Sequence, residues 1–89
     1  PKVVAAVYPN PIREDLTFNV KSQGENQIQI DLYDLNGRKI STITTGTVYE
    51  GENSIPAKLP LGLANGNYIA RIIDKNGSVL QNVKLVKVN

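Results

Sequence analysis

The sequence predicts an all-β protein, an antiparallel β-sandwich of about seven strands with no disulfide. Apolar residues alternate with polar ones at a period of two, as at Leu16, Phe18 and Val20, and no stretch repeats them at helical spacing. The alternating runs are bounded by Gly, Pro or Asn, which are typical turn residues. The chain contains no cysteine, so the core alone must hold the fold together.

The expected strands follow one another with short connections. Residues 16–20 and 28–32 alternate most regularly, and each predicts a half-buried strand. The remaining strands are expected at residues 3–8, 39–44, 53–57, 68–74 and 79–88. In the last of these, apolar residues occupy both parities around Leu85, so this strand either carries a bulge there or is buried on both faces.

Two connections share the same chemistry. Asn36-Gly37 and Asn76-Gly77 each follow an aspartate two residues earlier and stand between two strand runs. Asn-Gly is favoured in a two-residue type I′ turn, because that turn needs positive φ at both central residues. We therefore predict a tight hairpin turn of this type at both positions.

The first strand is expected to end at Tyr8-Pro9-Asn10-Pro11. The two prolines remove backbone donors and hold the residues before them extended. The simpler interpretation of this segment is a rigid crossover to the second strand. A ligand-binding role for Asn10 is the alternative, although the sequence indicates no partner for it.

The sequence LANGNY at residues 63–68 resembles the tyrosine corner of immunoglobulin-like sandwiches. In that motif, a tyrosine at the start of a strand returns its hydroxyl to the backbone a few residues upstream. Gly66 precedes Tyr68 by two residues, and Ala70 stands where antibody domains carry a cysteine. The motif therefore favours an immunoglobulin-like antiparallel sandwich without the disulfide.

The composition excludes most catalytic and metal chemistry. Histidine, cysteine and tryptophan are absent, which removes the usual general base near pH 7, common metal ligands and the best sugar-stacking side chain. The paired acids fall at expected strand edges or turns, where solvated carboxylates are ordinary: Glu14-Asp15 and Glu50/Glu52. We expect no enzyme activity, no cofactor and no metal. A calcium site from Asp31, Asp34, Asp74 and Asn side chains is a minor alternative, because no loop has the required ligand density.

Length and charge set the remaining bounds. We expect residues 1–89 to form a single domain, and the start at Pro1 without a methionine suggests a piece of a longer protein. Ten Lys and Arg stand against eight Asp and Glu, and their alternation gives little support for a nucleic-acid partner. The sequence contains no run of 18 apolar residues, so it predicts no membrane-spanning helix.

Several motifs in a fixed order carry a resemblance to a known family. They are Tyr8-Pro9-Asn10-Pro11, Leu16, Leu32-Tyr33-Asp34-Leu35-Asn36-Gly37-Arg38, Gly51, Leu59, Leu63, Gly66, Tyr68, Asp74, Gly77 and Lys84-Leu85-Val86-Lys87. Over essentially its whole length, the chain thus resembles the type A C-terminal sorting domains of proteins exported by the type IX secretion system of Bacteroidetes.

The resemblance implies an immunoglobulin-like, non-catalytic secretion signal at the end of a larger protein that is secreted or displayed on the cell surface. Its partners would be the outer-membrane translocon, a surface sortase and the cargo domain fused ahead of it. The whole protein would transit the periplasm on its way out of the cell. Members of the family are typically cut upstream of the domain by the sortase. The cleavage junction is therefore expected ahead of Pro1.

The basic tail has two interpretations. Beyond Asp74 the chain carries lysines and no acid, so one sheet edge would present lysines beside main-chain donors and acceptors. The pattern alone favours edge protection, since lysines on an edge strand discourage pairing with other chains. The resemblance instead favours recognition by the translocon through four residues of this tail, Lys84, Leu85, Val86 and Lys87.

Two other functions remain open, an accessory module of a secreted enzyme, fibronectin-like or carbohydrate-binding, and a structural spacer. Sugar binding normally needs a platform of exposed aromatic rings. The chain has five aromatic residues: Tyr8, Phe18, Tyr33, Tyr49 and Tyr68. Phe18 and Tyr68 are expected in the core or the corner, so the sequence predicts no such platform.

Overall fold

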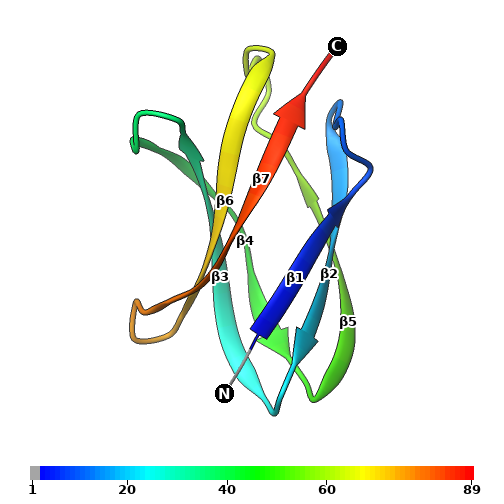
Figure 1. Ribbon diagram of the computed structural model, residues 1–89, viewed down its shortest axis with the longest axis vertical. Helices are drawn as coiled ribbons and strands as arrows, with labels where there is room; N and C mark the ends of the chain where they lie inside the picture. Colours follow the sequence, from blue (N-terminus) through cyan, green and yellow to red (C-terminus); the bar gives the residue numbers. More distant parts are fainter. Residues whose placement is uncertain (1–2) are drawn as a thin grey trace.

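Seven strands form two antiparallel sheets packed face to face in the computed structural model, which describes residues 3–89 (Figure 1). In chain order the strands are β1 (Val3–Tyr8), β2 (Asp15–Ser22), β3 (Asn26–Asp34), β4 (Lys39–Val48), β5 (Gly51–Lys58), β6 (Gly66–Asp74) and β7 (Val79–Lys87). One sheet has the order β1-β2-β5, and the other has the order β4-β3-β6-β7. The predicted all-β sandwich is confirmed, with β4 continuing to Val48, beyond the expected residue 44.

The apolar residues that alternate with polar ones in the sequence form the core, and the polar residues between them face outward. The apolar sets of β2 and β3 point into the space between the sheets, where Phe18 and Ile30 are fully buried. The other large side chains that are fully buried are Ile12, Leu32, Ile72, Leu85, Val20 and Val48. Because buried apolar surface contributes about 25 cal/mol per Å², this layer is the main source of stability in a chain without disulfides.

Both Asp-x-Asn-Gly connections are hairpin turns, but the predicted type I′ geometry is wrong. At the β3–β4 turn, the N–H of Gly37 donates to the carbonyl of Asp34 at 3.1 Å, and the N–H of Asp34 donates to the carbonyl of Arg38 at 3.0 Å. Gly37 has a φ of 85°, whereas Asn36 does not have the positive φ that a type I′ turn requires. The loop therefore has three residues and closes with a glycine bulge.

The aspartate side chain accounts for this geometry. Oδ1 of Asp34 accepts hydrogen bonds from the N–H groups of Asn36 and Arg38, at 2.9 and 3.0 Å. Asp74 makes the equivalent pair of bonds at the β6–β7 turn, where the glycine φ is 84°. These bonds fold the backbone around the carboxylate, so glycine alone occupies the left-handed region.

The last strand carries a bulge, but not at the position expected from the sequence. The pairing of β7 with β6 shifts between Ile72 and Ile73, which leaves Leu80 as the extra residue. Beyond this bulge, Val83 packs against the core and Leu85 is buried within it. The bulge thus lies several residues ahead of Leu85 and sets the facing of the rest of β7.

Tyr68 makes the return hydrogen bond of a tyrosine corner. Its hydroxyl donates to the carbonyl of Ala64 at 2.6 Å, while the ring lies in the core with only 8 % of the residue exposed. Gly66, the first residue of β6, has a φ of 146°. The corner therefore joins the loop after β5 to the start of β6.

The crossover between β1 and β2 lies along the outer edge of β7. The N–H of Ile12 donates to the carbonyl of Val86 at 2.7 Å, and the N–H of Val88 donates to the carbonyl of Ile12 at 2.8 Å. The side-chain oxygen of Asn10 accepts the N–H of Val86 at 3.1 Å. Because Ile12 is itself fully buried, the core anchors this extra segment against the end of the last strand.

Gln81 joins the two sheets where β1 and β7 lie side by side, running in the same direction (Figure 1). Its side-chain oxygen accepts the N–H of Ala5 at 2.7 Å, and its nitrogen donates to the carbonyl of Ala5 at 3.2 Å. Ala5 belongs to an edge strand, whose outward backbone groups need partners. The amide therefore takes the place of a neighbouring strand at this position.

Replacing Tyr68 with Phe should lower the free energy of unfolding by about 1 kcal/mol, because one hydrogen bond is lost while the buried ring is kept. For a domain of this size the midpoint of thermal unfolding should fall by about 4–8 °C. Calorimetry of the two proteins gives the comparison. An unchanged midpoint would show that the hydroxyl does not stabilise the corner.

Replacing Asn10 with Ala should free the N–H of Val86 and cost about 0.5–1 kcal/mol of unfolding free energy. Amide hydrogen exchange at Val86 should accelerate, whereas exchange at Ala5, which Gln81 protects, should change only with global stability. Asn10→Asp keeps an acceptor oxygen and is the matched control. Equal acceleration in both variants would mean that the side-chain oxygen of Asn10 does not hold β7.

Candidate functional site at the last strand

The four tail residues differ in what they present to solvent. Lys84 is exposed, and Lys87 is half-buried at the end of β7. Leu85 is 1 % exposed and belongs to the core, so its side chain has no free surface. Val86 is half-buried. Of the four side chains, only that of Lys84 is exposed. The two lysines lie on opposite faces of the strand because they differ in parity.

Part of the β7 edge is already occupied within the domain. The N–H and carbonyl of Val86 are bound by Asn10 and Ile12, so the edge offers neither group to a partner there. Lys84 has the same parity as Val86, and its backbone groups also point away from β6. Of the sheet edge that the sequence predicts as a docking strip, only the stretch around Lys84 is left without these bonds to Asn10 and Ile12.

Most of the motif residues gather at one end of the sandwich. The segment from Tyr8 to Pro11, the Asn36-Gly37 turn, the corner with Gly66 and Tyr68, and the end of β7 share this end (Figure 1). Asn76-Gly77 lies at the opposite end, where β6 turns into β7. The structure thus brings the motifs near the two ends of the chain together and leaves the second Asn-Gly turn apart.

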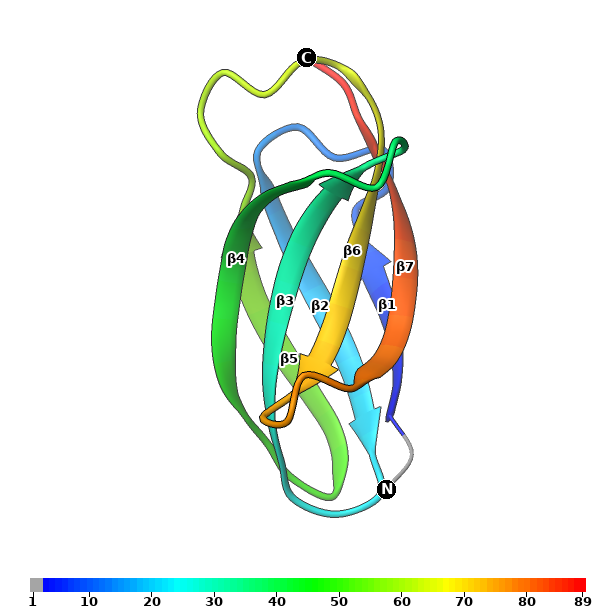
Figure 2. The ribbon, with the colours of Figure 1, turned by 90° about the vertical axis from the view of Figure 1, so that its left-hand side faces the viewer.

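Lys84 borders the outer face of the four-stranded sheet, which Figure 2 views from the front. Strand pairing sets Lys84 opposite Ile69, Ile69 opposite Tyr33, and Tyr33 opposite Lys39. This row crosses all four strands from β7 to β4. The sequence did not predict the row, because its members become neighbours only through strand register.

Arg71 lies beside this row. Its guanidinium carbon is 4.4 Å from the centre of the Tyr33 ring, and its Nε donates to the side-chain oxygen of Asn82 at 3.2 Å. A cation over an aromatic face is favourable by about 0.5–1 kcal/mol at an exposed site. The ring and the amide together orient the guanidinium on the outer face.

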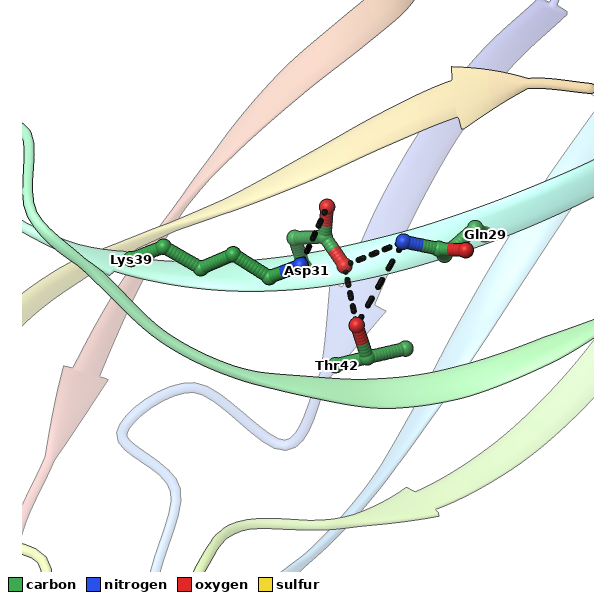
Figure 3. Close-up of polar contacts among 4 residues, drawn as sticks. All are labelled: Gln29, Asp31, Lys39 and Thr42. Atoms are coloured by element: carbon green, nitrogen blue, oxygen red, sulfur yellow. Dashed lines mark hydrogen bonds and ion pairs between the residues drawn. The ribbon is translucent and has the colours of Figure 1, made fainter. Parts of the chain in front are cut away.

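Asp31 is a buried carboxylate on the same outer face, with 3 % of the residue exposed. Figure 3 shows its partners: Oδ1 accepts from Thr42 Oγ1 at 2.7 Å and from Gln29 Nε2 at 2.9 Å, while Oδ2 lies 3.6 Å from Lys39 Nζ. Burying an unpaired charge is costly, so this cluster compensates the aspartate within the sheet. Its negative charge is therefore little available to a partner.

The two sheets differ in charge. Residues 26–48 and 66–89, which form the four-stranded sheet and its turns, contain six Lys or Arg and three Asp, a net charge of +3. Residues 3–25 and 49–65 contain three Lys or Arg and five Asp or Glu, a net charge of −2. The carboxylates of Asp34 and Asp74 hold turns, and that of Asp31 is buried. The four-stranded sheet is therefore the electropositive side of the domain.

The described residues do not assemble the alternative sites. Phe18 and Tyr68 are buried as expected, and the exposed rings of Tyr8 and Tyr49 lie at opposite ends of the three-stranded sheet. No group of three acidic, His or Cys side chains that could hold a metal ion occurs within residues 3–89, where Asp34 and Asp74 are at opposite ends of the long sheet. Among these residues, no helix could cross a membrane.

Shallow hollows occur on both sides of the sandwich. One, of about 420 Å³, lies over β3 and β4 and is lined by residues that include Gln27, Thr45 and Ile73. Another, of about 480 Å³, lies beside Tyr8 and Pro56 on the three-stranded sheet. Both are wide open, so neither forms an enclosed ligand pocket of the kind that binds small molecules.

Comparison with known proteins shows a shared fold and a family. A crystal structure of dimeric latent PorU from Porphyromonas gingivalis matches 97 % of this chain with a TM-score of 0.70 and 20 % identity, but only 9 % of that chain is covered. A structure of the Pseudomonas fluorescens alkylpurine DNA glycosylase AlkC bound to DNA containing an abasic site analog matches with a TM-score of 0.52 and 13 % identity, covering 99 % of this chain and 30 % of that one. No curated protein matches.

The chain thus spans about a tenth of the PorU chain and under a third of the AlkC chain. At these low sequence identities, the likeness concerns the fold alone. The family model gives the more specific result, because it matches residues 6–87 and so takes in the proline segment, the corner and the tail. This protein belongs to the family of secretion system C-terminal sorting domains.

Proposed function

We propose that this domain is a non-catalytic signal that directs a cargo protein, fused ahead of it, across the outer membrane by the type IX secretion system. The family match over residues 6–87 is the observation that carries the proposal. The cargo would pass through the periplasm and end outside the cell or on its surface. The translocon and a surface sortase would be the partners of the domain.

The arrangement of the strands supports recognition at the end of β7. In Figure 1, β1 begins at one end of the 36 Å long axis, and β7 finishes at the other. A cargo domain joined ahead of β1 would lie at the far end of the sandwich from Lys84, Leu85, Val86 and Lys87. The translocon could therefore contact the two lysines without obstruction by the cargo.

The proposal assigns different roles to the four tail residues. Lys84 and Lys87 supply the charge that the translocon reads. Leu85, which is buried, and Val86, whose backbone is bound by Ile12, hold the lysines in position. Deleting residues 84–89 would remove both roles at once, because it would also take away core packing and the partners of Ile12. Point substitutions of the lysines are the sharper test.

The basic test fuses residues 1–89 behind a periplasmic reporter in a host with a type IX system. The reporter should appear outside the cells when the domain is present and should stay in the periplasm without it. Cell fractionation followed by immunoblotting measures the extracellular share. A folded, intact fusion retained in the periplasm would contradict the sorting function.

A double substitution tests the role of the lysines. Lys84→Gln with Lys87→Gln should reduce the extracellular share of the reporter by about tenfold, if two charge contacts with the translocon are lost. Arg13→Gln with Lys21→Gln removes the same charge from exposed positions outside β7 and should leave export within about twofold. Equal export of the two variants would exclude the lysines as the residues that are read.

A further inference from the structure

The outer face of the four-stranded sheet carries a guanidinium that the domain orients but does not neutralise. Arg71 faces Asp31 across the β3–β6 pairing, yet the guanidinium lies over Tyr33 and bonds to Asn82. Asp31 is paired with Lys39 instead. Within residues 3–89, no ion pair involving Arg71 occurs. A charge held in place without a counter-ion is well suited to an external carboxylate.

The surroundings of Arg71 form a flat surface with both apolar and basic parts. Ile69 and Tyr33 are half-buried, so part of each side chain reaches solvent. Lys84 is opposite Ile69 on the neighbouring strand and adds an exposed cation to the half-buried Arg71. Apolar contact combined with two cations on adjacent strands fits an extended chain that carries acidic side chains.

We propose that the surface formed by Tyr33, Ile69, Arg71, Asn82 and Lys84 docks an acidic polypeptide segment of the secretion machinery. Arg71 would bind a carboxylate through its terminal nitrogens while Nε stays on Asn82, and Lys84 would contact a second acid. This inference rests on the proposed sorting function, because it supplies the partner chemistry for the same strand. It extends the recognised region from β7 onto β6 and β3.

The charge of the surface favours a polypeptide over other anionic partners. Recognition of an anionic lipid surface typically uses clusters of four to eight Lys and Arg, whereas this surface has two cations beside a compensated aspartate. Nucleic-acid binding uses longer basic stripes along a groove. Two cations beside apolar side chains instead match the composition of protein interfaces, in which Arg and Tyr are enriched.

The experiment uses the same reporter fusion and changes Arg71 in two independent ways. Arg71→Gln removes the charge, and Asn82→Asp leaves the arginine in place but gives its guanidinium a carboxylate within the domain. Both variants lower the net charge by one unit. Each should reduce the extracellular share of the reporter by about tenfold relative to the unmodified fusion.

Lys21→Gln is the matched control, because it makes the same charge change on an exposed residue of the other sheet. It should leave export within about twofold. Arg71→Lys keeps the charge but loses the planar fork, so its export should fall between those of the control and Arg71→Gln. Thermal unfolding of each purified fusion checks that the domain is folded.

The outcomes separate this inference from the sorting function. Failure of the unmodified fusion to leave the periplasm would overturn both. Export of the unmodified fusion together with normal export of Arg71→Gln and Asn82→Asp would overturn the docking surface and leave the sorting function standing. Reduced export of Arg71→Gln alone, with Asn82→Asp at the level of the control, would also overturn it, since the charge of Arg71 would then not be what the partner reads.

Discussion

The bonds between the beginning and the end of the chain are the constraint on which this structure depends. Gln81 bridges to Ala5 in the opposite sheet, and Ile12 lies beside Val86 on the edge of β7. These contacts join residues more than 70 positions apart along the seam between the sheets. Because β1 and β7 are both edge strands, each leaves backbone groups that the other end of the chain satisfies. The fold is closed only when its last strand is present.

This closure links the tail to the rest of the domain. The segment for which the family resemblance predicts recognition contains a core residue, Leu85, and a backbone partner of a buried isoleucine. The backbone at Val86 is held on both sides, by β6 and by the crossover, so the strand between the two lysines has a defined course. The proposed recognition of the tail would thus be recognition of a folded edge and not of a flexible peptide.

Local chemistry was readable from the sequence to a large extent. The alternation in β2 and β3, the return bond from Tyr68 and the two hairpins each depend on residues close together in the chain. The type I′ turn expected from Asn-Gly does not form, because the carboxylate of the preceding aspartate accepts two backbone N–H groups and sets a different turn. The predicted bulge was displaced to Leu80 for a related reason, since bulge position depends on the partner strand.

The outer face could not be derived in this way. Arg71 meets Tyr33 and Asn82 because β6 pairs with β3 on one side and with β7 on the other, and no pattern within one strand contains that register. The pairing of Ile12 with the edge of β7 was equally unpredictable, since Ile12 belongs to a connection between two strands of the other sheet. Parity separates the two faces of a strand, but only the pairing shows which residues of neighbouring strands form one surface.

The parallel course of β1 and β7 has a mechanical consequence. The two strands lie side by side and run in the same direction, so the start of β1 and the end of β7 lie at opposite ends of the long axis (Figure 1). A pull applied at those ends slides the strands past each other and loads the bonds between them together, instead of opening them one after another. Shear of this kind resists force better than unzipping does, so a machine that draws on one end of this domain while the other is held would load the bonds of Gln81 and Ile12 in this resistant way.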